Sequence, residues 1–189
     1  MEKEKFNKII SKSIKECEIF FKKHWKNANE LTMVLKSHLF VENCLDKFFL
    51  LAIPKPKHIL RKSFYDKVMI FDALNYSPDK ELITKLLAIN TLRNKYAHNL
   101  NYKLKLKDIK SLLEGVDIKS RKNKVKLARG LASTMSYLYT TKALFQMFPF
   151  ATTCYINRKI FEKEKACKMD KIIKKIYPND EKFDIVKSW

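Results

Sequence analysis

Residues 77–99 read S-P-D-K-E-L-I-T-K-L-L-A-I-N-T-L-R-N-K-Y-A-H-N, and this stretch decides the fold class. Ser77 and Pro78 mark a helix start, because serine caps the first turn and proline fits the first helical position. Apolar residues then recur every three or four positions, which predicts one long helix from Pro78 to about Asn99. Its last turns carry polar residues that a helix built only for a core does not need: Asn90, Arg93, Asn94 and His98.

The rest of the chain repeats the helical pattern. Asn29 is expected to cap a helix from Glu30 to about Ile53, which P-K-P-K at 54–57 ends. That helix has a dense apolar face: Leu31, Val34, Leu35, Leu39, Leu45, Phe48 and Phe49. Further helices are expected over 3–26, from the Ser63 cap to Leu74, and over 106–114, 124–148 and 155–176. With no strand pattern and no repeat, we predict a single all-α domain over 1–189, a helical bundle.

Charge points to a polyanionic partner. The 189-residue chain has 40 Lys and Arg against 20 Asp and Glu, a formal net charge of +20. A domain with this excess attracts polyanions, so nucleic acid is the first candidate partner. A general compositional bias toward lysine explains the same excess, and the sequence leaves both explanations open. Apolar residues make up 46% of the chain, which is enough for a packed core.

Several classes of protein are disfavoured. Cys17, Cys44, Cys154 and Cys167 form no C-x-x-C pair and no zinc-binding spacing with histidine, so we expect reduced thiols, no metal and no cofactor. The N-terminus M-E-K-E-K-F lacks the apolar segment of a signal peptide. No apolar run reaches the ~18 residues of a membrane-spanning helix. These features predict a cytoplasmic protein with no membrane partner.

The polar residues of 90–98 form one stripe. Asn90, Asn94 and His98 are spaced i, i+4 and i+8, and Arg93 borders them. In a chain that uses lysine nearly everywhere, arginine here suggests a planar, bidentate donor for phosphate or carboxylate. A plainer role is also open for His98, because a cationic histidine stabilises a helix C-terminus.

The segment R-N-K-Y-A-H at 93–98 resembles the R-N-x-x-x-H motif of the HEPN superfamily. Residues 37–48 (S-H-L-F-V-E-N-C-L-D-K-F), 63–74 (S-F-Y-D-K-V-M-I-F-D-A-L) and 86–98 are similar to successive helices of bacterial HEPN-like proteins, including the mannitol operon repressor group. The resemblance covers about residues 30–115, a HEPN-like core onto which helices from about 120–176 would pack.

The resemblance implies an all-α bundle that dimerises and places two motifs across one cleft. Many HEPN proteins are metal-independent endoribonucleases that act as toxins, with a cognate antitoxin protein, or in phage defence. Arg93 and His98 would be the catalytic pair, with Asn94 as their polar companion. In one subgroup the antitoxin adenylylates a Tyr two residues after the His. Here that position is Leu100, with Tyr102 two residues further on, so this control is not expected.

The residue types fit this chemistry on their own terms. Histidine moves protons near neutral pH, and arginine binds the equatorial oxygens of a phosphorane. One His98 per chain cannot easily serve as both acid and base, so a two-fold dimer around helix 78–99 is attractive. We expect such a dimer to bury Leu92 and Tyr96 if they border its seam.

Two further groups of residues are candidates for supporting roles. His38, Glu42 and Asp46 are spaced i, i+4 and i+8 on helix 30–53, where Glu42 is a candidate partner for Arg93 or His98. An ordinary solvated helix edge is the alternative. A basic run is expected to contact RNA phosphates, or else to be a solvated helix start: Lys119, Arg121, Lys122, Lys124, Lys126 and Arg129.

Two other functions stay open beside a ribonuclease. One is a non-catalytic regulator similar to the mannitol operon repressor, in which the motif is kept as structure. The other is an interaction module whose basic face binds nucleic acid or protein without cleaving it. Fold alone does not distinguish them.

Overall fold

The computed structural model describes residues 2–74, 80–99, 101–116 and 122–147, and these residues form only helices and their connections. The long helices are α1 (Glu2–Trp25), α2 (Glu30–Ala52), α5 (Lys80–His98) and α7 (Asn123–Met147). Shorter elements join them: α3 (Lys57–Leu60), α4 (Phe64–Ala73), α6 (Leu106–Ile109) and the 3-10 helix η1 (Lys110–Leu113). The predicted all-α class is therefore confirmed.

Local sequence signals set most helix ends. Asn29 accepts a hydrogen bond from the backbone N–H of Thr32 at 2.8 Å, so it caps α2 as predicted. Ser63 caps α4 in the same way, accepting from the N–H of Asp66 at 3.1 Å. Gly115 follows η1 with a φ of 68°, a left-handed conformation that glycine adopts without strain. The predicted helix over 155–176 and the start at 77–79 lie outside the described residues.

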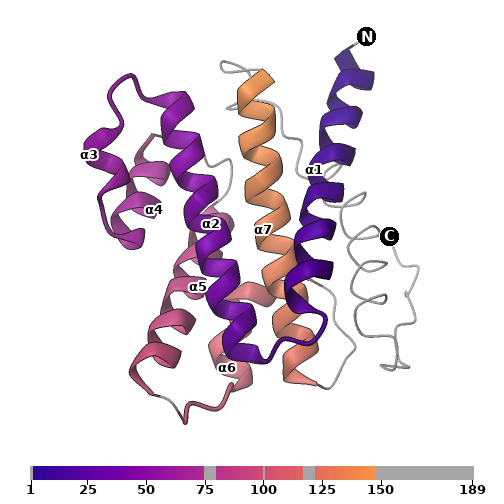
Figure 1. Ribbon diagram of the computed structural model, residues 1–189, viewed down its shortest axis with the longest axis vertical. Helices are drawn as coiled ribbons and strands as arrows, with labels where there is room; N and C mark the ends of the chain where they lie inside the picture. The colour runs from indigo at the N-terminus through magenta and orange to yellow at the C-terminus, as the bar shows by residue number, and fades with distance from the viewer. Residues whose placement is uncertain (1, 75–79, 100, 117–121, 148–189) are drawn as a thin grey trace.

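The long helices pack side by side, with α7 between α1 and α2 (Figure 1). Helix α5 packs against α2, α4, η1 and α7. The interior is aromatic: Phe21 stacks on Trp25 with ring centroids 4.4 Å apart, and Phe48 meets Phe71 edge-on at 5.0 Å. Gly130 brings α7 against η1, because a Cβ at this position would lie 2.8 Å from the Cβ of Leu112. These contacts hold α5 firmly along one side of the bundle.

Candidate functional site

The polar stripe of α5 divides into a buried end and an exposed end. Asn90 is half-buried and turns toward α2, whereas Arg93 and His98 are exposed near the C-terminal end of the helix. Arg93 Nη1 donates to Oδ1 of Asn94 at 3.0 Å, so these neighbouring side chains are already paired at the surface. The three motif residues Arg93, Asn94 and His98 thus lie within two turns of one helix.

His38 joins α2 to the motif helix. Its Nε2 lies 3.2 Å from Oδ1 of Asn90, and because an amide oxygen only accepts, Nε2 carries the proton in this pair. The ring is buried, 8% exposed, and it lies against the ring of Phe64 with centroids 4.2 Å apart. Its Nδ1 faces Oε2 of Glu42 at 4.0 Å. His38 is therefore an interior packing residue, and the alternative of a solvated edge is wrong for it.

Burial lowers the pKa of His38 below its ordinary value, since desolvation disfavours the charged imidazolium. The positive charges of Arg93 and Lys67 lower this pKa further. The hydrogen bond to Asn90 and the carboxylate of Glu42 act in the opposite direction but do not outweigh burial. His38 is consequently neutral near pH 7, and its donated hydrogen bond to Asn90 is compatible with this form.

A buried lysine pairs with the same glutamate, Glu42, that faces His38. Lys67 on α4 is 3% exposed, and its Nζ lies 3.0 Å from Oε1 of Glu42 and 2.8 Å from Oδ1 of Asp46. Burial acts to lower the pKa of Lys67, but the two carboxylates outweigh it and raise that pKa overall. Among the described residues the carboxylate of Glu42 thus pairs with Lys67, and not with Arg93 or His98 as the sequence suggested.

Lys67 was missed in the sequence, although a signal for it exists. It lies three residues after Phe64 and four before Phe71, and both of those aromatic side chains are buried. A lysine in the middle of a helix's apolar face is costly unless it is paired, so its position alone calls for acidic partners. Glu42 and Asp46, one turn apart on α2, are those partners.

The end of the motif helix is fixed by a second set of contacts. The hydroxyl of Tyr96 donates to Oε2 of Glu30 at 3.3 Å, and the ring of Tyr96 meets that of Tyr102 edge-on at 4.8 Å. Tyr102 in turn donates to Oδ2 of Asp108 at 2.5 Å. Tyr96 is buried and Leu92 is fully buried inside the protomer, so the expectation that a dimer seam would bury them is wrong.

Apolar side chains are exposed on the two helices that hold His38 and Phe64. On α2, Leu35 is 37% and Leu39 is 64% exposed, although both belong to the apolar face that the sequence shows for this helix. On α4, Tyr65 is 53% and Met69 is 39% exposed. Leu39 and Tyr65 directly follow His38 and Phe64 in the chain. We call these four exposed apolar side chains, two on each helix, the α2–α4 patch.

The predicted basic run is only partly a surface. Lys119 and Arg121 lie outside the described residues. Lys122 is exposed, whereas Lys124 and Lys126 are half-buried at the start of α7. Arg129 is 7% exposed because it faces the packed side of α7, so it cannot serve an accessible phosphate site as predicted.

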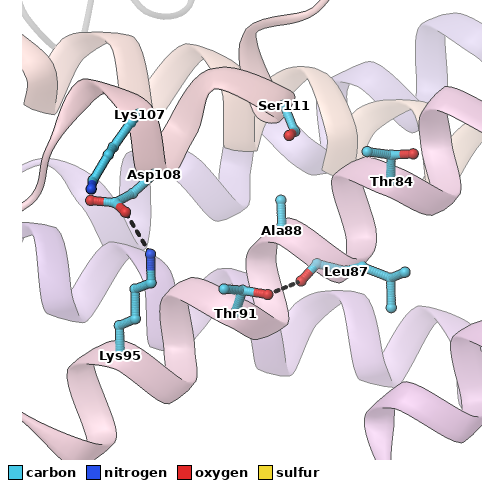
Figure 2. Close-up of a pocket in the computed structure, with 8 residues that line it drawn as sticks. All are labelled: Thr84, Leu87, Ala88, Thr91, Lys95, Lys107, Asp108 and Ser111. Carbon is cyan, nitrogen blue, oxygen red and sulfur yellow. Dashed lines mark hydrogen bonds and ion pairs between the residues drawn. The ribbon is translucent and has the colours of Figure 1, made fainter.

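A groove that the sequence did not reveal runs between α5 and the α6–η1 segment (Figure 2). It has a volume of about 490 Å³. Figure 2 shows the residues that line it: Thr84, Leu87, Ala88, Thr91 and Lys95 on α5, and Lys107, Asp108 and Ser111 on the opposite wall. Lys95 crosses the groove to Asp108, with its Nζ 2.5 Å from Oδ1.

The described part of the chain contains no cluster of three or more His, Cys, Asp or Glu residues placed to hold a metal ion. Within the same residues, no helix is both long and apolar enough to cross a membrane. Cys17 and Cys44 are buried thiols, and desolvation raises the pKa of Cys44 to about 12. Cys154 and Cys167 lie outside the described residues. The polar groups at the C-terminal end of α5 are therefore the strongest candidate site.

Comparison with known proteins assigns the chain to no family. No protein-family model, curated protein or solved structure matches the chain. The functional interpretation therefore depends on the residues and contacts described above.

Proposed function

We propose that the protein is a metal-independent endoribonuclease of HEPN type, acting as a toxin or in phage defence. The observation that carries this proposal is the division of the α5 stripe. Asn90 is used by the fold, whereas Arg93 and His98 are exposed and the half-buried Asn94 bonds to Arg93. An exposed arginine and imidazole, with an amide beside the arginine, lie within two turns of one helix and supply the groups that cleavage of an RNA phosphodiester needs.

Each group has a specific role in the proposed reaction. His98 transfers protons, either from the attacking 2′-hydroxyl or to the leaving 5′-oxygen. Arg93 stabilises the negative charge that develops on the phosphorane oxygens, and Asn94 holds the Arg93 guanidinium by the hydrogen bond already present. The products of this route are a 2′,3′-cyclic phosphate and a 5′-hydroxyl.

The same chemistry calls for a two-fold dimer, because a single His98 cannot act as acid and base in one step. The α2–α4 patch supports this arrangement, since exposed large apolar side chains on two packed helices are candidates for an interaction surface. Isologous pairing through the patch would duplicate the motif without any change in sequence. The residues that we propose for the dimer seam are therefore those of the α2–α4 patch, and no longer Leu92 and Tyr96.

The buried network behind the motif has a positioning role in this proposal. His38, Glu42 and Asn90 were candidate supporting residues, and they connect α2 to α5 one turn before Arg93. Lys67 completes the network from α4. None of these side chains needs to contact RNA in order to fix the direction of the motif.

The test uses substitutions with matched controls from the same chain. Arg93→Ala and His98→Ala should each abolish RNA cleavage while circular dichroism shows an unchanged helical content. Arg61→Ala and His58→Ala are suitable controls, because both residues are exposed on or beside α3. Controls as inactive as the motif variants would contradict the assignment, as would activity that survives both motif substitutions.

Mixing the two inactive variants tests the shared cleft. If Arg93 and His98 act across a dimer, mixtures of Arg93→Ala and His98→Ala chains should recover part of the activity that neither variant has alone. A Leu39→Glu substitution in the α2–α4 patch should produce monomers and lose cleavage together. A protein that is monomeric by light scattering and fully active would refute the dimer, whatever the motif residues do.

A further inference from the structure

The groove between α5 and the α6–η1 segment continues the surface that carries the motif. One row of side chains along α5 follows spacings of four, three and four residues: Leu87, Thr91, Asn94 and His98. Thr91, in the groove, precedes His98 by seven residues, which is about 10 Å along the helix axis. A strand bound at His98 can therefore run directly into the groove.

The walls of the groove present hydrogen-bond acceptors and positive charge. The hydroxyls of Thr84 and Thr91 donate to the carbonyls of Lys80 and Leu87, at 3.1 and 3.0 Å. Because each hydroxyl proton is used within the helix, its oxygen can only accept a hydrogen bond from a ligand in the groove. Such acceptors suit ligand donors, for example a ribose 2′-hydroxyl or a base amino group.

The nearby carboxylates are already neutralised. Asp108 accepts from Lys95 Nζ and the Tyr102 hydroxyl, both at 2.5 Å, and from the N–H of Lys105 at 3.1 Å. These contacts lower the pKa of Asp108 despite its desolvation, so it stays ionised and paired. Glu81 on α5 lies 2.5 Å from Lys85 Nζ and is likewise paired.

The segment over residues 103–110 carries four exposed lysines, of which Lys107 lines the groove. The other three are Lys103, Lys105 and Lys110. With Asp108 and Glu81 paired, the charge left for a ligand is positive, which complements a phosphodiester backbone. Leu87 and Ala88 add an apolar surface against which a base or sugar can pack.

From this geometry we infer that the groove is a subsite for single-stranded RNA, which holds a nucleotide beside the one cleaved and distinguishes ribose from deoxyribose. The inference rests on the proposed ribonuclease function and names how its substrate is held. Lys107 contacts phosphate, and the oxygens of Thr84 and Thr91 accept from the ribose 2′-hydroxyl.

The test measures binding separately from cleavage. On a His98→Ala background, fluorescence anisotropy is recorded with a labelled mixed-sequence RNA of about 12 nucleotides and with DNA of the same sequence. Lys107→Gln should weaken RNA binding and lower the slope of log K against log salt by about 0.7, the value for one contact with a single strand. Lys15→Gln, an exposed lysine on α1, is the matched control and should leave the slope unchanged.

The threonines give a second, independent result. Thr84→Val and Thr91→Val keep the shape of each side chain but remove its oxygen, and each should weaken RNA binding about two- to tenfold while DNA binding is unchanged. In chains with an intact His98, the same substitutions should raise KM more than they lower kcat.

The outcomes separate the two proposals. If RNA binds and the groove variants change affinity but no chain cleaves RNA, the subsite stands and the ribonuclease proposal fails. If RNA is cleaved while Lys107→Gln, Thr84→Val and Thr91→Val match the wild type in affinity and KM, the subsite is overturned. A chain that binds neither probe at low salt overturns it as well.

Discussion

Replacing Lys67 by methionine should cost the protein much of its stability. The substitution keeps the volume of the side chain but removes the cation that lies 3.0 Å from Glu42 and 2.8 Å from Asp46. Breaking a buried ion pair by removing one partner costs about 3–5 kcal/mol. The side chains of Glu42 and Asp46 are 30% and 33% exposed, so water partly solvates the two carboxylates that lose their cation. We therefore expect a loss of about 2–4 kcal/mol.

Urea unfolding followed by far-ultraviolet circular dichroism measures this loss. With a slope of about 1–3 kcal/mol per molar urea, the midpoint of Lys67→Met should fall by roughly 1–2 M. Lys15→Met, at an exposed position on α1, is the control and should change stability by less than about 0.5 kcal/mol.

A triple variant shows whether charge is the cause. Combining Lys67→Met with Glu42→Gln and Asp46→Asn removes the unpaired charges, and it should recover most of the lost stability because neutral replacements of buried ion pairs are often well tolerated. The reasoning is refuted if Lys67→Met stays within about 0.5 kcal/mol of the wild type. It is also refuted if the triple variant is no more stable than the single one, since shape would then explain the loss.

Three further predictions concern other parts of the bundle. Gly130→Ala should destabilise the protein by about 1–2 kcal/mol in urea unfolding. The added Cβ would crowd Leu112, and the free energy lost in this way exceeds what alanine gains over glycine in helix propensity; a more stable variant would contradict this. The pKa of His38 is lower in the folded chain than in the unfolded chain, so on acidification the unfolded chain binds a proton first. The contribution of His38 to the free energy of unfolding is therefore complete above pH ~6.5 and is lost as the pH falls below that value. His38→Gln should consequently show a smaller drop in urea midpoint between pH ~7.5 and ~5.5 than the wild type, and equal drops would count against the buried neutral imidazole. Asn29→Ala should cost about 1 kcal/mol through loss of the α2 cap, whereas Asn27→Ala in the same turn should leave the thermal midpoint nearly unchanged.

Helices could be predicted from the sequence because their signals are local. The caps at Asn29 and Ser63 and the three-to-four spacing of apolar residues are complete within a few turns. The four-residue helix α3 was missed because it is too short for periodicity, and its N-cap, Pro56, makes no side-chain cap hydrogen bond. The motif residues Arg93, Asn94 and His98 were predictable for the same reason, since one helix carries all three.

Contacts between helices were not predictable in this way. Spacing places His38 and Glu42 on one face of α2, but only the packing of α4 and α5 shows that they face Lys67 and Asn90. The burial of Arg129 depends likewise on neighbouring helices that periodicity does not identify. The groove beside α5 forms where two separate segments meet, so no stretch of sequence contains it.

The most direct test of the central claim is the chemistry of the RNA ends that the purified protein leaves in excess EDTA. The account predicts 2′,3′-cyclic phosphate or 3′-phosphate ends with matching 5′-hydroxyls from the wild-type chain, and no cleavage from His98→Ala purified identically. Cleavage that EDTA abolishes, ends carrying a 5′-phosphate, or equal activity in His98→Ala would contradict it.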